Sequence, residues 1–135
     1  MTEIRYAAEE DKKLLLKSDR HISEETCEEL IKSRRIIVIF IDKKFAGWLR
    51  YNLFWDEIPF INMLYLFDEY RRKGYGTALL SFFESEMIKL GYRKVMTSSQ
   101  ADEYAQHFYR KLGYMDAGSF FPFCTELEII FTKEL

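Results

Sequence analysis

The most informative segment of the chain reads Leu64-Tyr65-Leu66-Phe67-Asp68-Glu69-Tyr70-Arg71-Arg72-Lys73-Gly74-Tyr75-Gly76-Thr77. An apolar, strand-like run leads into three consecutive cations, then two glycines, and then a helical pattern. Backbone N–H groups at a helix start lack internal partners and carry the positive end of the helix dipole. Glycines let such a backbone approach an anion closely, and arginine suits bidentate phosphate contact. The segment therefore predicts a strand–turn–helix unit that binds a diphosphate.

Two other phosphate-binding motifs fit this turn less well. A dinucleotide-binding G-x-G-x-x-G would need a third glycine where this chain has Leu79. A P-loop would need Gly-Lys-Ser/Thr at the helix start, which this chain lacks. The remaining alternative is a basic, solvated turn whose glycines serve only its tight geometry.

Hydrophobic patterning on either side of this segment predicts the other elements. Apolar or alternating runs indicate strands at 3–7, 36–41, 45–55, 60–67, 95–98, 115–121 and 127–132. Helical spacing, caps and stops indicate helices at 9–17, 23–35, 79–90 and 103–112. Hairpins followed by crossovers predict an α/β (α+β) fold, with a mixed sheet of about six to seven strands flanked by about four helices.

Composition limits the class of protein. The 135 residues fit a single domain spanning 1–135. The formal charge is 20 − 22 = −2, so no general attraction to nucleic acid or to an anionic membrane is expected. No apolar run reaches the roughly 20 residues of a membrane span, and the polar N-terminus is unlike a signal peptide. Two isolated cysteines and two isolated histidines offer no metal-ligand spacing. We therefore expect a cytoplasmic protein without a metal.

Two motifs carry a resemblance to a known family. The segment 71–76 is similar to the signature Q/R-x-x-G-x-G/A of the GNAT family of N-acetyltransferases. A second family pattern, Asn-x-x-Ala-x-x-x-Tyr-x-x-x-Gly-Phe, is matched in spacing by Asp102, Ala105, Tyr109, Gly113 and Tyr114. Both motifs occur in the family's order between residues 58 and 118. The resemblance implies the GNAT-like acyl-CoA N-acyltransferase fold.

The resemblance also implies a co-substrate and the residues that bind it. Acetyl-CoA is the expected acyl donor, and no metal is expected. The strand residues Leu64, Tyr65 and Leu66 would offer backbone groups to the pantetheine arm. The diphosphate would be held by Arg71, Arg72, Lys73, Gly74, Tyr75, Gly76 and Thr77. Asp102 would lie near the pantetheine in place of the family's asparagine; alternatively, it caps the helix at 103–112.

The implied reaction is a direct attack of a neutral amine on the thioester, without a covalent enzyme intermediate. Tyr109 stands where the family places its general acid; the alternative is an aromatic that packs on the sheet. Many members of the family use a glutamate on the strand before the turn as the general base. This chain has Phe60 at that position, so the glutamate is absent. Proton removal would then proceed through water, or through Glu57 or Asp56 in the preceding turn. The alternative is that both are ordinary solvated carboxylates.

The expected acceptor is a primary amine of a small molecule or a peptide. The regions that set acceptor specificity in this fold contain acidic, aromatic and histidine residues: His21, Glu24, Glu25, Glu28, Trp55, Asp56, Glu57 and residues 120–123. Such groups suit a cationic amine, although aromatics of this kind also serve as core or as a homodimer surface. The rival functions are a non-catalytic acyl-CoA-binding sensor or regulatory module, and a structural protein that retains the fold. The acceptor, the acyl chain, the base and the oligomeric state stay open at this stage.

Overall fold

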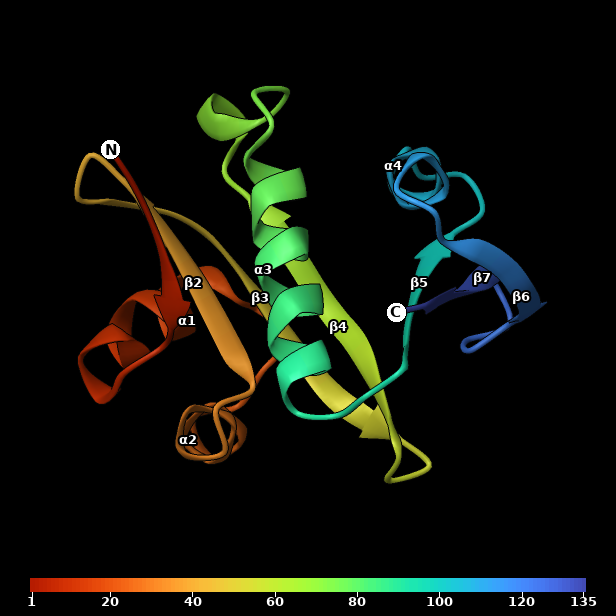
Figure 1. Cartoon of the computed structure of the whole chain (residues 1–135), viewed down its shortest axis with the longest axis horizontal. Coiled ribbons are helices and arrows are strands. Elements are labelled where there is room, and N and C mark those ends of the chain that lie inside the picture. The colour runs from red at the N-terminus through yellow and green to blue at the C-terminus, as the bar shows by residue number, and fades with distance from the viewer. The chain divides into compact units, whose positions relative to one another are not determined.

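The computed structural model describes all of residues 1–135, as a mixed sheet of seven strands with four α-helices (Figure 1). The elements are β1 Thr2–Tyr6, α1 Lys12–Ser18, α2 Glu24–Lys32, β2 Ile36–Ile41, β3 Lys44–Phe54, β4 Ile58–Leu66, α3 Tyr75–Lys89, β5 Lys94–Gln100, α4 Ala105–Lys111, β6 Met115–Phe120 and β7 Glu128–Glu134. Two short 3₁₀ turns are added, η1 Glu9–Asp11 and η2 Asp68–Tyr70. The strand order is β1-β2-β3-β4-β5-β7-β6, with β4 parallel to β5. The predicted fold class is confirmed.

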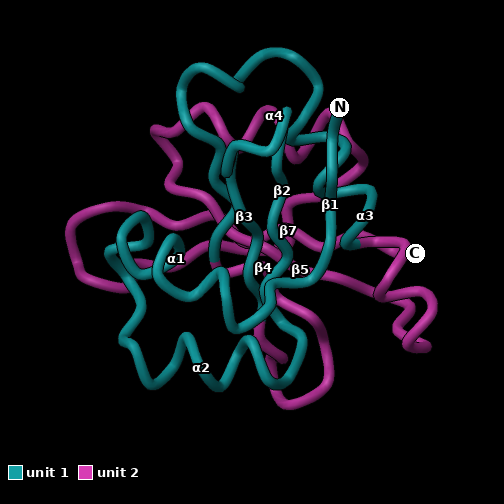
Figure 2. The backbone as a smooth tube through the Cα atoms, turned by 90° about the vertical axis from the view of Figure 1, so that its left-hand side faces the viewer, with its two compact units in different colours: residues 1–51, 63–83 teal, residues 52–62, 84–135 magenta.

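The chain forms two compact units, which Figure 2 colours separately. Unit 1 comprises residues 1–51 and 63–83, and unit 2 comprises residues 52–62 and 84–135. The strands β3 and β4 and the helix α3 each contribute residues to both units. None of the helices combines the length and the apolar character that a membrane span requires.

The core of unit 1 lies on both faces of β2 and β3. Because strand side chains alternate, Val38 and its partner Trp48 share one face, where they pack with buried residues of α1 and α2. Tyr51 lies on the other face, 5.2 Å between ring centroids from Phe83 of α3. Helices therefore cover both faces of β2, which explains why its sequence is almost continuously apolar. The strand predicted at 36–41 is confirmed, and five of its six residues are buried.

A buried ion pair fixes the end of α1 to β3 within unit 1. Arg50 Nε donates to Asp19 Oδ2 at 2.7 Å, and Trp48 Nε1 donates to the same oxygen at 3.1 Å. The backbone N–H of His21 donates to Asp19 Oδ1 at 3.0 Å. Burial alone would raise the pKa of the Asp19 carboxyl. The hydrogen bonds from Arg50 and His21, the Arg50 charge and the Trp48 hydrogen bond outweigh it, so the pKa lies below its ordinary value.

In unit 2, α4 covers one face of the three C-terminal strands. Tyr109 of α4 lies 6.1 Å from Phe131 of β7 between ring centroids, and Thr97 of β5 is directly opposite Phe131 in the sheet. Ser98 and Glu128 must therefore point to the other face, because successive strand residues alternate. The strand β6 forms the edge of the sheet, and all of its residues are exposed.

Local sequence signals account for the start of α2 and the end of α3. Ser23 caps α2, because its hydroxyl accepts the Thr26 N–H at 3.1 Å. Gly91 follows the end of α3 with a φ of 94°, which glycine adopts without strain. The 3₁₀ turn η2 and the replacement of the first turn at 9–17 by η1 were not predicted.

The start of α4 differs from the sequence-based prediction. The helix begins at Ala105 rather than 103, and its N-cap residue is Tyr104, which makes no side-chain cap hydrogen bond. The preceding loop is fixed instead by Gln106, whose Nε2 donates to the carbonyl oxygens of Ala101 and Glu103 at 2.6 and 2.8 Å. The prediction that Asp102 caps this helix is therefore wrong.

Candidate functional site

The turn between β4 and α3 presents backbone donors at the start of a long helix. Arg72 and Gly74 both have positive φ, at 61° and 88°, and these reverse the chain between η2 and α3. The first intrahelical hydrogen bond runs from the Ala78 N–H to the Gly74 carbonyl at 3.0 Å. The N–H groups of residues 75–77 precede this bond, so they remain available to an anion at the positive end of the helix dipole.

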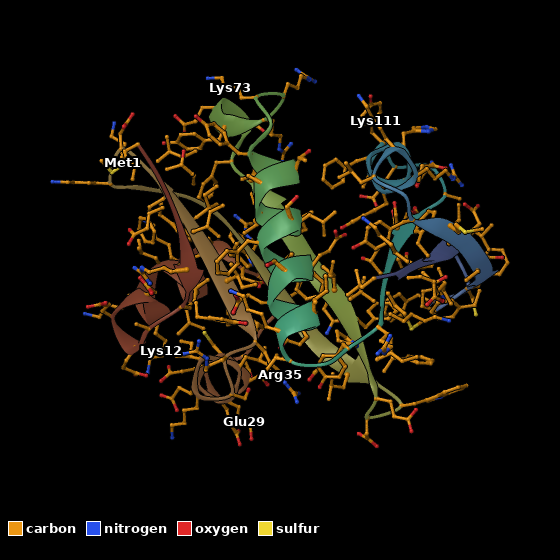
Figure 3. All side chains as sticks on the ribbon, viewed as in Figure 1. Met1, Lys12, Glu29, Arg35, Lys73 and Lys111 are labelled. Carbon is orange, nitrogen blue, oxygen red and sulfur yellow. The ribbon has the colours of Figure 1, made fainter.

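The three cations of the turn differ in their surroundings. Arg71 Nε donates to the Leu66 carbonyl at 2.8 Å, and its Nη1 lies 2.9 Å from Asp68 Oδ1. The Arg71 guanidinium also lies 5.0 Å from the centre of the Tyr65 ring. Arg71 therefore braces the turn against the end of β4. Arg72 and Lys73 are exposed and form no ion pair within unit 1, and Figure 3 places Lys73 on the loop that leads into α3.

The C-terminal half of β4 lies unusually close to β3 in unit 1. A Cβ atom added to Gly47 would lie 2.2 Å from the Tyr65 carbonyl oxygen and 2.8 Å from Leu66 Cδ2. The Phe67 N–H donates to the Ala46 carbonyl at 3.0 Å. Only glycine allows this approach, so Gly47 sets the position of the strand backbone at residues 65–66. An isolated glycine within a strand pattern is a sequence signal for such a contact.

Replacing Gly47 with alanine should therefore displace β4. The added methyl group collides with backbone rather than with a flexible side chain, so we expect a loss of about 1–3 kcal/mol of stability. Urea unfolding measures this change. An unchanged urea midpoint would show that β4 can move away from β3 without loss of stability. It would contradict the conclusion that only glycine fits at position 47.

In unit 2, Tyr109 is buried, with an exposed fraction of 5%. Its ring packs against Phe108, Tyr114 and Phe131 at centroid distances of 5.3, 5.4 and 6.1 Å. Burial raises the pKa of Tyr109 to about 12, against a smaller lowering by its hydrogen bond with Thr97. The Thr97 hydroxyl in turn lies 3.2 Å from the Ile61 carbonyl, to which it donates. Tyr109 thus holds its proton throughout the neutral range.

A second buried tyrosine of unit 2 is bound to α3. The Tyr114 hydroxyl donates to Glu84 Oε2 at 2.8 Å, and Lys133 Nζ lies 3.0 Å from Glu84 Oε1. Burial, the Glu84 charge and this hydrogen bond all raise the pKa of Tyr114. Through its contacts with the Tyr114 hydroxyl and Lys133 Nζ, the Glu84 carboxylate links α3 to β7.

The predicted carboxylates of the hairpin and of the loop before α4 are exposed and lie in unit 2. Glu57 and Asp56 are exposed at the β3–β4 hairpin, where Trp55 is 77% exposed. Asp102 is exposed before α4. The structure thus groups the turn and residues 64–66 in unit 1, and places Tyr109, Glu57 and Asp102 in unit 2. No group of three or more His, Cys, Asp or Glu side chains is placed to hold a metal ion.

Comparisons with known proteins agree with this architecture. The model of the acetyltransferase (GNAT) family matches residues 3–114. An acetyltransferase of the GNAT family from Bacillus cereus ATCC 10987 superposes with a TM-score of 0.78 at 22% identity, covering 99% of this chain and 97% of that one. The ribosomal-protein-S18-alanine N-acetyltransferase from Escherichia coli superposes with a TM-score of 0.82 at 21% sequence identity. The match covers 99% of this chain and 94% of that one.

A third solved structure contains a ligand. The PaiA N-acetyltransferase from Thermoplasma acidophilum, in complex with coenzyme A, gives a TM-score of 0.79 at 21% identity and covers 100% of this chain and 99% of that one. Identities of this size support the fold alone. The comparison with curated proteins finds no match. The family model, by contrast, spans most of the sequence, and the chain belongs to the acetyltransferase (GNAT) family.

Proposed function

We propose that this chain is an acetyl-CoA-dependent N-acetyltransferase that transfers an acetyl group to a primary amine of a small molecule or peptide. The observation that carries the proposal is the turn at 71–77. Its exposed cations, Arg72 and Lys73, and the free N–H groups at the start of α3 form an anion site directly after β4. The coenzyme A complex of the structurally similar PaiA enzyme supports a CoA diphosphate as the anion.

Within this proposal, each part of the CoA molecule has its own residues. Residues 71–77 hold the diphosphate, with Arg71 shaping the turn and the other two cations free to contact phosphate oxygens. The backbone of Leu64, Tyr65 and Leu66 binds the pantetheine amides, at the position that Gly47 sets. Asp102 is proposed to lie beside the pantetheine arm.

The chemistry is a direct attack of the neutral amine on the thioester carbonyl. Tyr109 is the proposed general acid for the departing CoA thiolate, since a pKa of about 12 keeps it protonated. A thiolate with a pKa near 8.5 is already a fair leaving group, so this assistance is modest. Glu57 is the carboxylate that the sequence offers for proton removal from the amine, and its exposure at the hairpin fits action through water.

Replacing Tyr109 with phenylalanine should slow turnover by less than the roughly 10²–10⁴-fold effect of a full acid–base catalyst. Its affinity for CoA should be unchanged, because only the hydroxyl is removed. The matched control is Tyr104→Phe, which removes a hydroxyl from a tyrosine that is 82% exposed and close by in sequence. Equal kcat values for both variants and the wild type would show that Tyr109 is not the general acid. Tyr109 would then serve only in packing α4 on the sheet.

One observation favours a second function, a non-catalytic acyl-CoA-binding module. Phe60 occupies the position of the family's basic glutamate, and its ring lies 6.2 Å from that of Phe54. A thiol reagent that follows CoA release from acetyl-CoA, with pooled amines, peptides and polyamines, separates the two functions. Release above the hydrolysis rate supports the enzyme. Tight CoA binding without release in any pool would support the binding module.

A further inference from the structure

Glu128 stands apart from the other carboxylates that are not fully exposed. Five of these six carboxylates pair with a cation, at N···O distances of 2.6–3.0 Å, namely Asp11, Asp19, Glu28, Glu84 and Glu86. Glu128, at the start of β7, has no Lys or Arg of unit 2 within 4.0 Å. Its carboxylate Oε2 accepts a hydrogen bond of 2.7 Å from the Ser98 hydroxyl. A half-buried carboxylate without a counterion in its own unit is open to a cation from outside the chain.

The surroundings of Glu128 suit an alkylammonium ion. In the sheet register, Glu128 lies opposite Gln100 on β5 and opposite Phe120 on β6, so the three share one face. Phe120 is 48% exposed and offers an aromatic ring to a cation beside the carboxylate. None of Ser98, Gln100 and Phe120 carries a titratable group. The α4 helix packs on the opposite face, where Tyr109 meets Phe131.

We propose that Glu128 receives the ammonium group of a cationic acceptor amine and takes its proton, with Ser98 holding the carboxylate in place. This inference rests on the proposed function and names the substrate class and the base of the same reaction. The ammonium contacts the Glu128 carboxylate, the Phe120 ring and the Gln100 side chain. A neutral molecule of the same shape gains neither the ionic nor the cation–π contact.

The position of Glu128 relative to the proposed acid is consistent with this role. Ser98 directly follows Thr97, the hydrogen-bond partner of Tyr109. The paired residues of the parallel strands β4 and β5 end at Ile61 and Thr97, directly before Ser98. The acid and the base are thus fixed to adjacent residues of β5 and lie on opposite faces of it. The attacking nitrogen and the leaving sulfur are bonded to one carbon in the tetrahedral intermediate. A base and an acid that approach from different sides therefore fit this chemistry.

The proton balance of the step closes without a further reactant. The Glu128 carboxylate takes one proton from R–NH₃⁺, which leaves the neutral amine. Its nitrogen forms the C–N bond to the thioester carbonyl, the C–S bond breaks, and the sulfur leaves as thiolate. Tyr109 gives its proton to the thiolate and regains one from the acylated nitrogen. Glu128 then releases its proton to water, so the products are the amide, CoA–SH and one H⁺.

Glu128 fits the base role better than the hairpin candidate Glu57. Glu57 is exposed at the β3–β4 hairpin, so an amine would find its carboxylate hydrated. Glu128 is half-buried and oriented by Ser98, which reduces the reorganisation needed when the ammonium binds.

A binding measurement tests this inference without turnover. Wild type, Glu128→Gln and the control Glu126→Gln are titrated by NMR with propylamine, benzylamine and benzyl alcohol, in the presence of CoA. Glu126 is exposed two residues earlier, so its replacement makes the same charge change. We expect an amine probe to bind wild type and the control at least about 10-fold more tightly than Glu128→Gln, and benzyl alcohol to show no such difference. Equal affinities, or no amine binding to wild type, would overturn the inference.

A kinetic measurement tests the proton transfer for any amine that the wild type acetylates. Glu128→Gln should lower kcat/KM by about 10²-fold or more at pH 7. This deficit should narrow as the pH approaches the amine pKa of about 10, because solution then supplies neutral amine. A deficit that stays constant with pH would assign Glu128 a structural role only. The binding titration and the thiol-release assay read different events, so a failure of this inference is distinguishable from a failure of the proposed function.

Discussion

Replacing Asp19 with asparagine is expected to destabilise the protein by about 3–5 kcal/mol at neutral pH, the usual cost of removing one partner of a buried ion pair. The Arg50 guanidinium, whose Nε lies 2.7 Å from Asp19 Oδ2, would stay buried without a counterion, because the asparagine amide carries no charge. The Trp48 N–H shares that oxygen, so the whole contact between the end of α1 and β3 is weakened. Urea unfolding measures the loss.

A matched control isolates the effect of burial. Asp42→Asn makes the same chemical change at an exposed position, the β2–β3 turn, and should alter stability little. Similar losses of stability in both variants would show that the buried Asp19–Arg50 pair contributes no more than an exposed carboxylate.

The pH dependence of this effect has a defined sign. The pKa of Asp19 is lower in the folded chain than in the unfolded chain, so the charged pair stabilises the fold above the ordinary carboxyl pKa of about 3.9. The contribution is lost as the pH falls through the folded-state pKa. The stability difference between wild type and Asp19→Asn should therefore be full at pH 7 and should shrink in strong acid. A difference independent of pH would contradict the lowered pKa.

Removing both exposed cations of the turn should have the largest effect on co-substrate binding. The double variant Arg72→Ala/Lys73→Ala is expected to bind CoA about 10²-fold more weakly, since hydrogen bonds to charged groups contribute about 1.5–3 kcal/mol each and solvent screens part of this. Its melting temperature should stay close to that of the wild type, because neither side chain forms an ion pair. Isothermal titration with CoA at low and high salt measures the affinity.

The control for this variant removes the same charge elsewhere in unit 1. Lys13→Ala/Lys17→Ala takes two exposed cations from α1 and should leave CoA affinity unchanged. At high salt, the affinities of the turn variant and the wild type should converge. Equal weakening in both double variants would show a general charge effect rather than a site at the turn.

The strand–turn–helix unit around residues 71–77 could be predicted from sequence because its signals are consecutive. Three cations, two glycines and the onset of helical spacing all fall within residues 71–79, and in the structure these residues form the turn before α3 and its first residues. The cap at Ser23 was predictable for the same reason, since its partner is Thr26, three residues away. Short-range patterns of this kind depend on local backbone geometry, which the sequence specifies directly.

Contacts between distant residues could not be predicted in this way. Asp19 and Arg50 are 31 positions apart, and the chain has 22 acidic and 20 basic residues that could pair. Likewise, the sequence does not show that Glu128 lacks an ion-pair partner in its unit, because the pairing of the carboxylates depends on which distant residues the fold brings together. Gly47 is intermediate, because its isolated position in a strand pattern signals a close contact but does not name Tyr65 as the partner.

Simultaneous measurement of both products tests the central claim most directly. Purified protein is incubated with acetyl-CoA and pooled primary amines, while released CoA is followed with a thiol reagent and acetylated amine by mass spectrometry. We expect amine-dependent CoA release, with one acetylated amine formed for each CoA. CoA release that does not depend on amine, or no release in any pool despite tight CoA binding, would contradict the assignment as an N-acetyltransferase.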